Sequence, residues 1–185
     1  MKLVIGGAFQ GKLEFAQKTY QISDGWIDGR ICDPEEITQC RGIHHFHEYI
    51  RRMPEMTQKS SAEREKNQNT VEDSLSEAER NQNQKKERKS ASEIESGQSP
   101  EIAGAGFINT DNPSMIEQQA EAFADWLYKK NTNLVIVSNE LGYGVVPIEK
   151  EDRLWRETVG RVCTCIAARA DEVVRVVCGI GTRLK

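Results

Sequence analysis

A short apolar run that leads at once into glycines and a lysine constrains the fold of this chain more than any other feature. Residues 2–5 have the character of a buried parallel strand, and residues 13–20 read as a helix. Between them lies the run Gly6-Gly7-Ala8-Phe9-Gln10-Gly11-Lys12, which fits G-x-x-x-x-G-K. In such a unit the loop N–H groups cradle phosphate oxygens and the lysine neutralises phosphate charge. The sequence predicts a nucleotide site over residues 6–13, the alternative being a glycine-rich turn that happens to contain lysine.

The position after Lys12 departs from that pattern. Ser or Thr normally stands there and its hydroxyl binds Mg²⁺, whereas this chain has Leu13. Mg²⁺ would have to be held by phosphates, water and carboxylates from elsewhere, which puts standard phosphoryl transfer in doubt. Glu140 is the best acidic candidate because it follows the most apolar strand, although it could be a solvated strand-end carboxylate. Further candidate contacts follow the second expected strand: Asp28, Gly29, Arg30 and Asp33.

Strands and helices alternate along the chain. Strands are expected near residues 26–28, 134–138 and 173–177, the last of them closing the chain, and helices over about 113–130 and 149–170. Residues 35–52 carry a helical pattern interrupted at Gly42. This order predicts a single α/β domain over residues 1–185 with a largely parallel sheet and helices on both faces.

Residues 54–106 differ from the rest of the chain. They consist mainly of Ser, Glu, Lys, Asn, Gln and Arg, and they contain no aromatic residue. Such a segment cannot bury enough apolar surface to offset its ordering entropy. We expect a disordered or loosely helical insertion, with a partner-binding arm as the alternative.

Composition excludes several classes of protein. A net charge of −4 and a pI near 5.5 argue against a nucleic-acid partner. No segment has the length and apolarity of a membrane span, and the first residues lack the apolar stretch of a signal peptide. The five cysteines include no paired C-x-x-C motif, so we expect reduced thiols in a cytoplasmic protein and no metal site.

All three histidines of the chain are clustered at His44, His45 and His47. Imidazole can act as a metal ligand, a general base or a nucleophile toward phosphorus. A nucleophile is favoured over a metal ligand because no other good ligand set accompanies the histidines. We predict His45, and then His44, as the nucleophile; the alternative places one or two of the histidines on a solvated helix face.

The end of the chain resembles a known enzyme family. Residues 137–147, V-S-N-E-L-G-Y-G-V-V-P, are similar to the S/T-N-E-x-G-x-G-I/V-V-P signature of the adenosylcobinamide kinase/adenosylcobinamide-phosphate guanylyltransferase family, and the likeness continues over residues 153–185. The phosphate loop resembles the family's G-G-x-x-S-G-K-S, with Gln10 and Leu13 at its two hydroxyl positions. The family's internal strand with a D/E-C-L/I-T motif is not recognisable, and the insertion lies about where it is expected.

The resemblance implies a P-loop NTPase-like fold, often assembled as a homotrimer, and two reactions that use GTP, ATP and Mg²⁺. Adenosylcobinamide is phosphorylated, and GMP then passes from GTP through a histidine to adenosylcobinamide phosphate. In this chain Asp33-Pro34-Glu35 and His44-His45 lie in a similar order to the family's acidic segment and nucleophile. The alternatives are a degenerate member that binds GTP or a corrinoid without turnover, and a kinase for another small molecule.

Overall fold

The structure, a computed structural model, describes residues 1–53 and 113–185, with side chains from residue 116 onward in the second range. The expected insertion at 54–106 therefore lies outside the described residues. A six-stranded sheet has the order β2-β3-β4-β1-β5-β6. The pairs β2–β3, β3–β4, β4–β1 and β1–β5 are parallel, whereas β6 pairs antiparallel with β5. The strands are β1 Lys2–Gly6, β2 Trp26–Asp28, β3 Gly42–His44, β4 Val135–Asn139, β5 Glu172–Val177 and β6 Ile180–Arg183.

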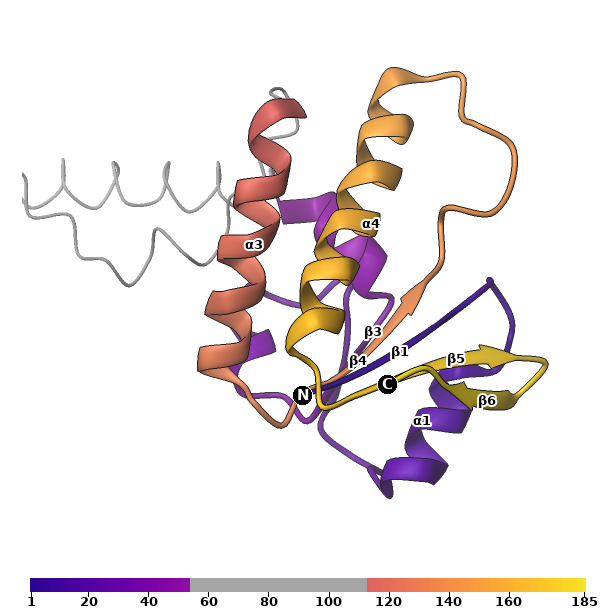
Figure 1. Cartoon of the computed structure of the whole chain (residues 1–185). Helices are drawn as coiled ribbons and strands as arrows, with labels where there is room; N and C mark the ends of the chain where they lie inside the picture. Colours follow the sequence, from indigo (N-terminus) through magenta and orange to yellow (C-terminus); the bar gives the residue numbers. More distant parts are fainter. Residues whose placement is uncertain (54–112) are drawn as a thin grey trace, which may run out of the picture.

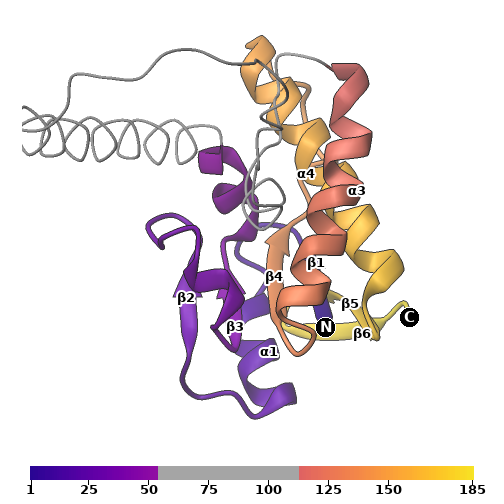
Figure 2. The same cartoon turned by 90° about the vertical axis from the view of Figure 1, so that its left-hand side faces the viewer.

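Helices cover both faces of this sheet. They are α1 Lys12–Tyr20, α3 Pro113–Lys130 and α4 Lys150–Arg169; residues 46–53 are also helical. Figure 1 shows α3 and α4 side by side on one side of the strands and α1 on the other, and Figure 2 shows the same arrangement after a quarter turn. The largely parallel α/β fold of P-loop NTPase type is thereby confirmed.

Two apolar clusters fill the spaces on either side of the sheet. Alternate residues of a strand point to opposite faces. In β4, Val135 and Val137 accordingly pack with Ala16 of α1, whereas Ile136 packs in the larger cluster that contains residues of α3 and α4. Both clusters are needed because a central parallel strand is covered on both sides, which explains the nearly continuous apolar sequence of β4.

The expected helical pattern over residues 35–52 is wrong in its middle part. A 3₁₀ turn, η1 at Glu36–Thr38, is followed by strand β3 between β2 and β4, and helix resumes at Phe46. Strand β3 thus lies between β2 and β4 in the sheet. In the sequence it precedes residues 54–106, the segment in which the family's internal strand is expected. Ile43 is fully buried between its neighbours, so pairing with strands distant in sequence determines this short segment.

The expectation that residues 173–177 form the last strand of the chain is wrong. Strand β5 turns back into a further strand, β6. The turn consists of Cys178 and Gly179, both with positive φ, at 50° and 78°. Two consecutive residues in this conformation are typical of a type I′ hairpin turn. The Cys-Gly pair is not the usual Asn-Gly signal, and the sequence reading therefore missed the hairpin. Among the described residues, no helix is both long and apolar enough to cross a membrane.

Candidate nucleotide site

The five parallel strands β2, β3, β4, β1 and β5 end at the same edge of the sheet. In the strand register, Gly6 of β1 lies opposite Asn139 of β4, and Asp28 of β2 lies opposite His44 of β3. The carboxyl ends of parallel strands are where α/β folds place their ligands. The phosphate loop, Asp28 and the histidine segment are therefore brought together by topology.

The loop between β1 and α1 has the backbone that its glycines require. Gly6 has φ of 154°, and a Cβ atom there would lie 2.3 Å from the carbonyl oxygen of Val176. Gly11, at φ 76°, is the N-cap of α1. The N–H groups of the first helical turn have no carbonyl partner within the helix and are available to an anion.

Gln10 ties the loop to the β5–β6 turn. The N–H of Cys178 donates to Gln10 Oε1 at 2.6 Å, and the N–H of Gly179 donates to the Gln10 carbonyl at 2.9 Å. Phe9, by contrast, projects fully into solvent at the tip of the loop. Gln10 thus supports the loop structurally, at a position where the family that this loop resembles has a hydroxyl side chain.

Lys12 crosses beneath the loop and is only 7% exposed. Its Nζ donates to the Gly7 carbonyl at 2.6 Å and to Asn139 Oδ1 at 2.7 Å. Burial lowers the pKa of Lys12, while the nearby Glu140 carboxylate acts in the opposite direction. The ammonium is held at the loop before any ligand arrives, so a phosphate meets a cation that is already oriented.

Asn139 links this lysine to the histidine segment. Its Nδ2 lies 3.0 Å from His47 Nε2, and its backbone nitrogen lies 3.4 Å from His47 Nδ1. Both Asn139 nitrogens can only donate, and a neutral imidazole can accept at one nitrogen only. We assign the acceptor to Nε2 because that contact is the shorter of the two. Burial, followed by electrostatic repulsion from the His45 and Lys12 side chains, lowers the pKa of His47 to about 4.

His44 and His45 face the carboxylate of Asp28. His45 Nδ1 lies 3.2 Å from Asp28 Oδ1 and 2.6 Å from His44 Nδ1, and His44 Nδ1 lies 3.9 Å from the same carboxylate oxygen. Arg30 also holds the carboxylate: its Nε donates to both oxygens, and its Nη2 donates to Oδ2 at 2.6 Å. Burial alone would raise the pKa of Asp28, but Arg30 and the two histidines outweigh it and hold that pKa well below its usual range. Burial lowers the pKa of His44.

The phosphate loop and the three histidines line one pocket of about 510 Å³. His45 is the most accessible of the three, with its side chain 37% exposed, compared with 19% for His44 and 6% for His47. The lining residues are Ala8, Phe9, Gln10, Gly11, Lys12, Leu13, Glu14, Arg30, His44, His45, His47, Glu48, Val137 and Asn139. Residues 8–13, Arg30 and the predicted nucleophiles are therefore brought together as the sequence predicts.

Other candidate residues lie elsewhere. Gly29 is buried and donates its N–H to the His44 carbonyl, so it packs behind the histidines. Asp33 is exposed and does not line the described part of the pocket. Glu140 faces the α4 side of the sheet, where Arg175 Nε donates to it at 3.1 Å.

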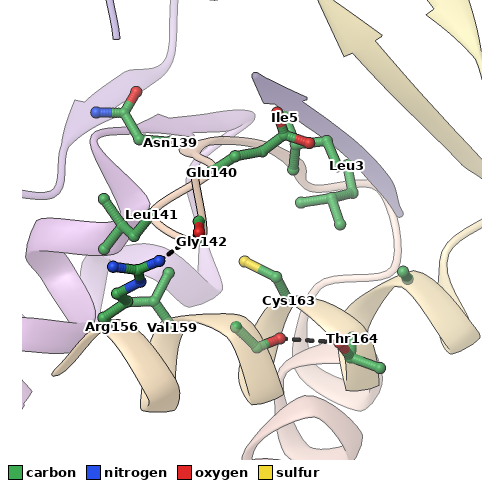
Figure 3. Close-up of a pocket in the computed structure, with 12 residues that line it drawn as sticks. Leu3, Ile5, Asn139, Glu140, Leu141, Gly142, Arg156, Val159, Cys163 and Thr164 are labelled. Atoms are coloured by element: carbon green, nitrogen blue, oxygen red, sulfur yellow. Dashed lines mark hydrogen bonds between the residues drawn. The ribbon is translucent and has the colours of Figure 1, made fainter. Parts of the chain in front are cut away.

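Glu140 instead lines a second pocket of about 290 Å³ between β1, β4 and α4, shown in Figure 3. Leu3 and Ile5 form one apolar wall of this pocket, and Cys163 and Thr164 come from α4. Asn139 borders both pockets. The sequence predicts Glu140 for the nucleotide site, but the residue that reaches Lys12 is the preceding Asn139. Its place as the last residue of the buried strand β4 is the sequence signal that points to it.

The signature segment after β4 is held by arginines of α4. Arg156 donates to the carbonyls of Gly142 and Val145, and Arg153 donates to those of Pro147 and Ile148. Conversely, Tyr143, Val145 and Ile148 are exposed. These arginines of α4 thus fix the backbone of the loop that follows the site.

Comparisons with known proteins agree with this picture over the second part of the chain. A family model described as cobinamide kinase / cobinamide phosphate guanyltransferase matches residues 51–184. The match begins after the phosphate loop and the three histidines, so their roles rest on the geometry above.

Curated relatives match over shorter stretches. The bifunctional adenosylcobalamin biosynthesis protein CobU of Salmonella typhimurium is 48% identical over 52 residues, which is 28% of this chain and 29% of that protein. CobU of Escherichia coli is 46% identical over 52 residues, with the same coverage. The bifunctional protein CobP of Pseudomonas aeruginosa is 32% identical over 75 residues, 40% of this chain and 43% of the relative. The chain thus aligns with less than half the length of each relative, while the family match spans well over half of the chain itself. On this basis the chain belongs to the cobinamide kinase / cobinamide phosphate guanyltransferase family.

Proposed function

We propose that this chain is a nucleotide-dependent transferase of cobalamin biosynthesis that moves GMP from GTP, through a histidine, to adenosylcobinamide phosphate. Family membership supports the class of reaction. One observation carries the mechanism: the Asp28–His45 pair and Lys12 belong to a single site around the phosphate loop. By resemblance to the family, we also expect a cytoplasmic homotrimer that can use ATP or GTP to phosphorylate adenosylcobinamide.

The phosphates of GTP bind at the start of α1 in this proposal. The N–H groups around Gly11 and the ammonium of Lys12 receive the phosphate oxygens. Lys12 is already held by Gly7 and Asn139, so little reorganisation is needed when the ligand binds.

His45 is the proposed nucleophile because a carboxylate can orient it. With the proton on Nδ1, shared with Asp28 at 3.2 Å, Nε2 carries the lone pair. Nε2 attacks the α-phosphorus of GTP, an N–P bond forms, and the bond to the bridging oxygen of the β-phosphate breaks. Pyrophosphate leaves with the electron pair, and Asp28 stabilises the resulting imidazolium.

The second displacement regenerates the histidine. A phosphate oxygen of adenosylcobinamide phosphate attacks the same phosphorus, the N–P bond breaks, and Nε2 recovers its lone pair. The product is adenosylcobinamide-GDP. Splitting the transfer in two lets one pocket serve two phosphate acceptors in turn.

The family implies Mg²⁺, which prefers oxygen ligands and commonly keeps one or two carboxylates plus substrate phosphates. Leu13 supplies no oxygen, but the Glu48 carboxylate lines the pocket. Glu48 together with nucleotide phosphates would suit Mg²⁺, which would neutralise phosphate charge. Because no hydroxyl follows Lys12, we expect guanylyl transfer to be better retained than kinase activity.

Leu13 also supports a second candidate function, a family member that binds GTP or a corrinoid without turnover. The two proposals differ in whether a covalent adduct forms.

The experiment is to incubate the full chain with Mg²⁺ and GTP labelled at the α-phosphate, and to map any adduct by mass spectrometry. We expect an acid-labile phosphoramidate on His45 that is absent from His45→Ala and reduced in Asp28→Asn. Leu13→Ser should raise the rate of adenosylcobinamide phosphorylation by ATP. Label that persists in His45→Ala and His44→Ala would refute the histidine mechanism. A parent protein that binds GTP but never becomes labelled would favour the binding-only function.

A further inference from the structure

Three potential metal ligands converge beside the phosphate loop. One ligand atom each from Asp28, His44 and His45 lie within 4.8 Å of one another. The Nδ1 atoms of His44 and His45 lie 2.6 Å apart. Asp28 Oδ1 lies 3.2 Å from His45 Nδ1 and 3.9 Å from His44 Nδ1. A tetrahedral ion with bonds of about 2.0–2.1 Å has ligand atoms roughly 3.3 Å apart. Two of the three distances thus lie within about 0.6 Å of that spacing, and the third needs a small rotation of the exposed His45 ring.

The carboxylate of this cluster is already fixed from outside. Arg30 donates from its backbone N–H and its guanidinium, which orients Oδ1 toward the histidines. Ligating carboxylates are commonly held by such outer contacts. The backbone also contributes, since Asp28 and His44 are register partners at the ends of β2 and β3.

The chemistry of the donors selects the ion. Two imidazole nitrogens and one carboxylate suit zinc and related first-row cations, whereas Mg²⁺ prefers oxygen ligands alone. A three-ligand set leaves a fourth position open. His44 and His45 line the same pocket as Lys12, so that position faces the space proposed for phosphates.

We propose that Asp28, His44 and His45 form a binding site for a divalent transition-metal cation at the phosphate pocket. The fourth ligand is water or a phosphate oxygen. Metal binding does not require the guanylyl transfer proposed above. One consequence does rest on that function: a metal on Nδ1 of neutral His45 places the proton on Nε2, the atom needed as nucleophile. Metal bound at Nδ1 therefore holds His45 in the form that cannot attack, and it should slow formation of the GMP adduct.

Metal binding is tested without nucleotide, on full-length protein stripped with a chelator. Co²⁺ serves as a visible-absorption probe and Zn²⁺ is titrated by calorimetry. We expect one ion per chain with a tetrahedral Co²⁺ spectrum. Asp28→Asn and His44→Gln should each weaken affinity by at least about tenfold, the lower end of what the loss of outer-shell contacts alone costs.

Asp24→Asn is the matched control, because Asp24 is an exposed carboxylate paired with Arg41. It should leave affinity unchanged. Every histidine and cysteine of the chain lies within the described residues, so competing ligand sets can be recognised. Thiolate-to-cobalt charge-transfer bands, equal affinity in Asp28→Asn and the parent, or no binding at millimolar Co²⁺ would each overturn the proposed site.

The second arm measures labelling from α-labelled GTP with Mg²⁺ while Zn²⁺ is added. We expect labelling of the parent to fall as the site fills. Labelling whose rate is unaffected by saturating Zn²⁺ would refute the inhibition of adduct formation by bound metal. A parent that binds Zn²⁺ through these residues but is never labelled would refute the transfer reaction and leave the metal site standing.

Discussion

The buried imidazole of His47 should make the stability of this protein depend on pH in a defined window. In the fold, burial lowers the pKa of His47 to about 4, while in the unfolded chain its pKa is near 6.5. Between these values the unfolded chain binds a proton that the folded chain does not. The free energy of unfolding therefore rises with pH in this window and falls as pH drops from 6.5 toward 4.

The size of the effect follows from the two pKa values. At 1.36 kcal/mol per pKa unit, the difference between 6.5 and about 4 corresponds to about 3 kcal/mol lost by pH 4. His44, whose pKa burial also lowers, acts in the same direction. The titration of Asp28 affects the free energy of unfolding only below this window. Its pKa is lowered in the fold, so its contribution to stability is lost only as pH falls below about 3.8.

Urea unfolding followed by tryptophan fluorescence at pH 4 to 7.5 measures this effect. His47→Gln removes the titrating group while keeping an acceptor for Asn139 Nδ2, and the parent's excess stability over this variant should shrink by about 3 kcal/mol between pH 7 and pH 4. His44→Gln separates the contribution of the second histidine. Parallel stability curves for the parent and His47→Gln across the window would refute the reasoning.

Four further predictions concern other residues and segments of the chain. Lys12→Ala should weaken GTP binding measured by calorimetry roughly tenfold to a hundredfold, because a charge-assisted hydrogen bond contributes about 1.5–3 kcal/mol; unchanged affinity would contradict the phosphate-loop assignment. Gly29→Ala should destabilise the fold by about 1–3 kcal/mol in urea, because its Cβ would lie 2.5 Å from the His45 carbonyl oxygen. In contrast, Gly160→Ala, in open space on α4, should stabilise it by about 0.5–1 kcal/mol. Excising residues 57–104 and joining the ends with a Gly/Ser linker should leave the melting temperature nearly unchanged, and loss of folding would show that the segment is structural.

Local sequence was enough to predict the phosphate loop and the long elements. Gly6 cannot carry a side chain, since a Cβ there would lie against the carbonyl of Val176, and the positive φ of Gly11 favours glycine. Strand β4 and helix α4 are long and strongly patterned, so their existence and type follow from periodicity. The three histidines that cluster in the sequence all line the same pocket as the loop, while the assignment of the nucleophile among them stays a prediction.

Only the tertiary structure decided the short elements. Strand β3 has three residues, too few for a period to show, and it exists because β2 and β4 pair with it on either side. The Asp28–His45 pair depends on that pairing, because it needs the ends of β2 and β3 side by side.

The choice between Asn139 and Glu140 was likewise tertiary. Both follow the same apolar run, but successive residues of a strand point to opposite faces. Val137 packs on the α1 side, and two positions later Asn139 reaches Lys12 on that side. Glu140 therefore points toward α4 and pairs with Arg175. The sequence determined that polar groups end this strand, whereas the sheet register and the position of α1 decided which of them meets the phosphate loop.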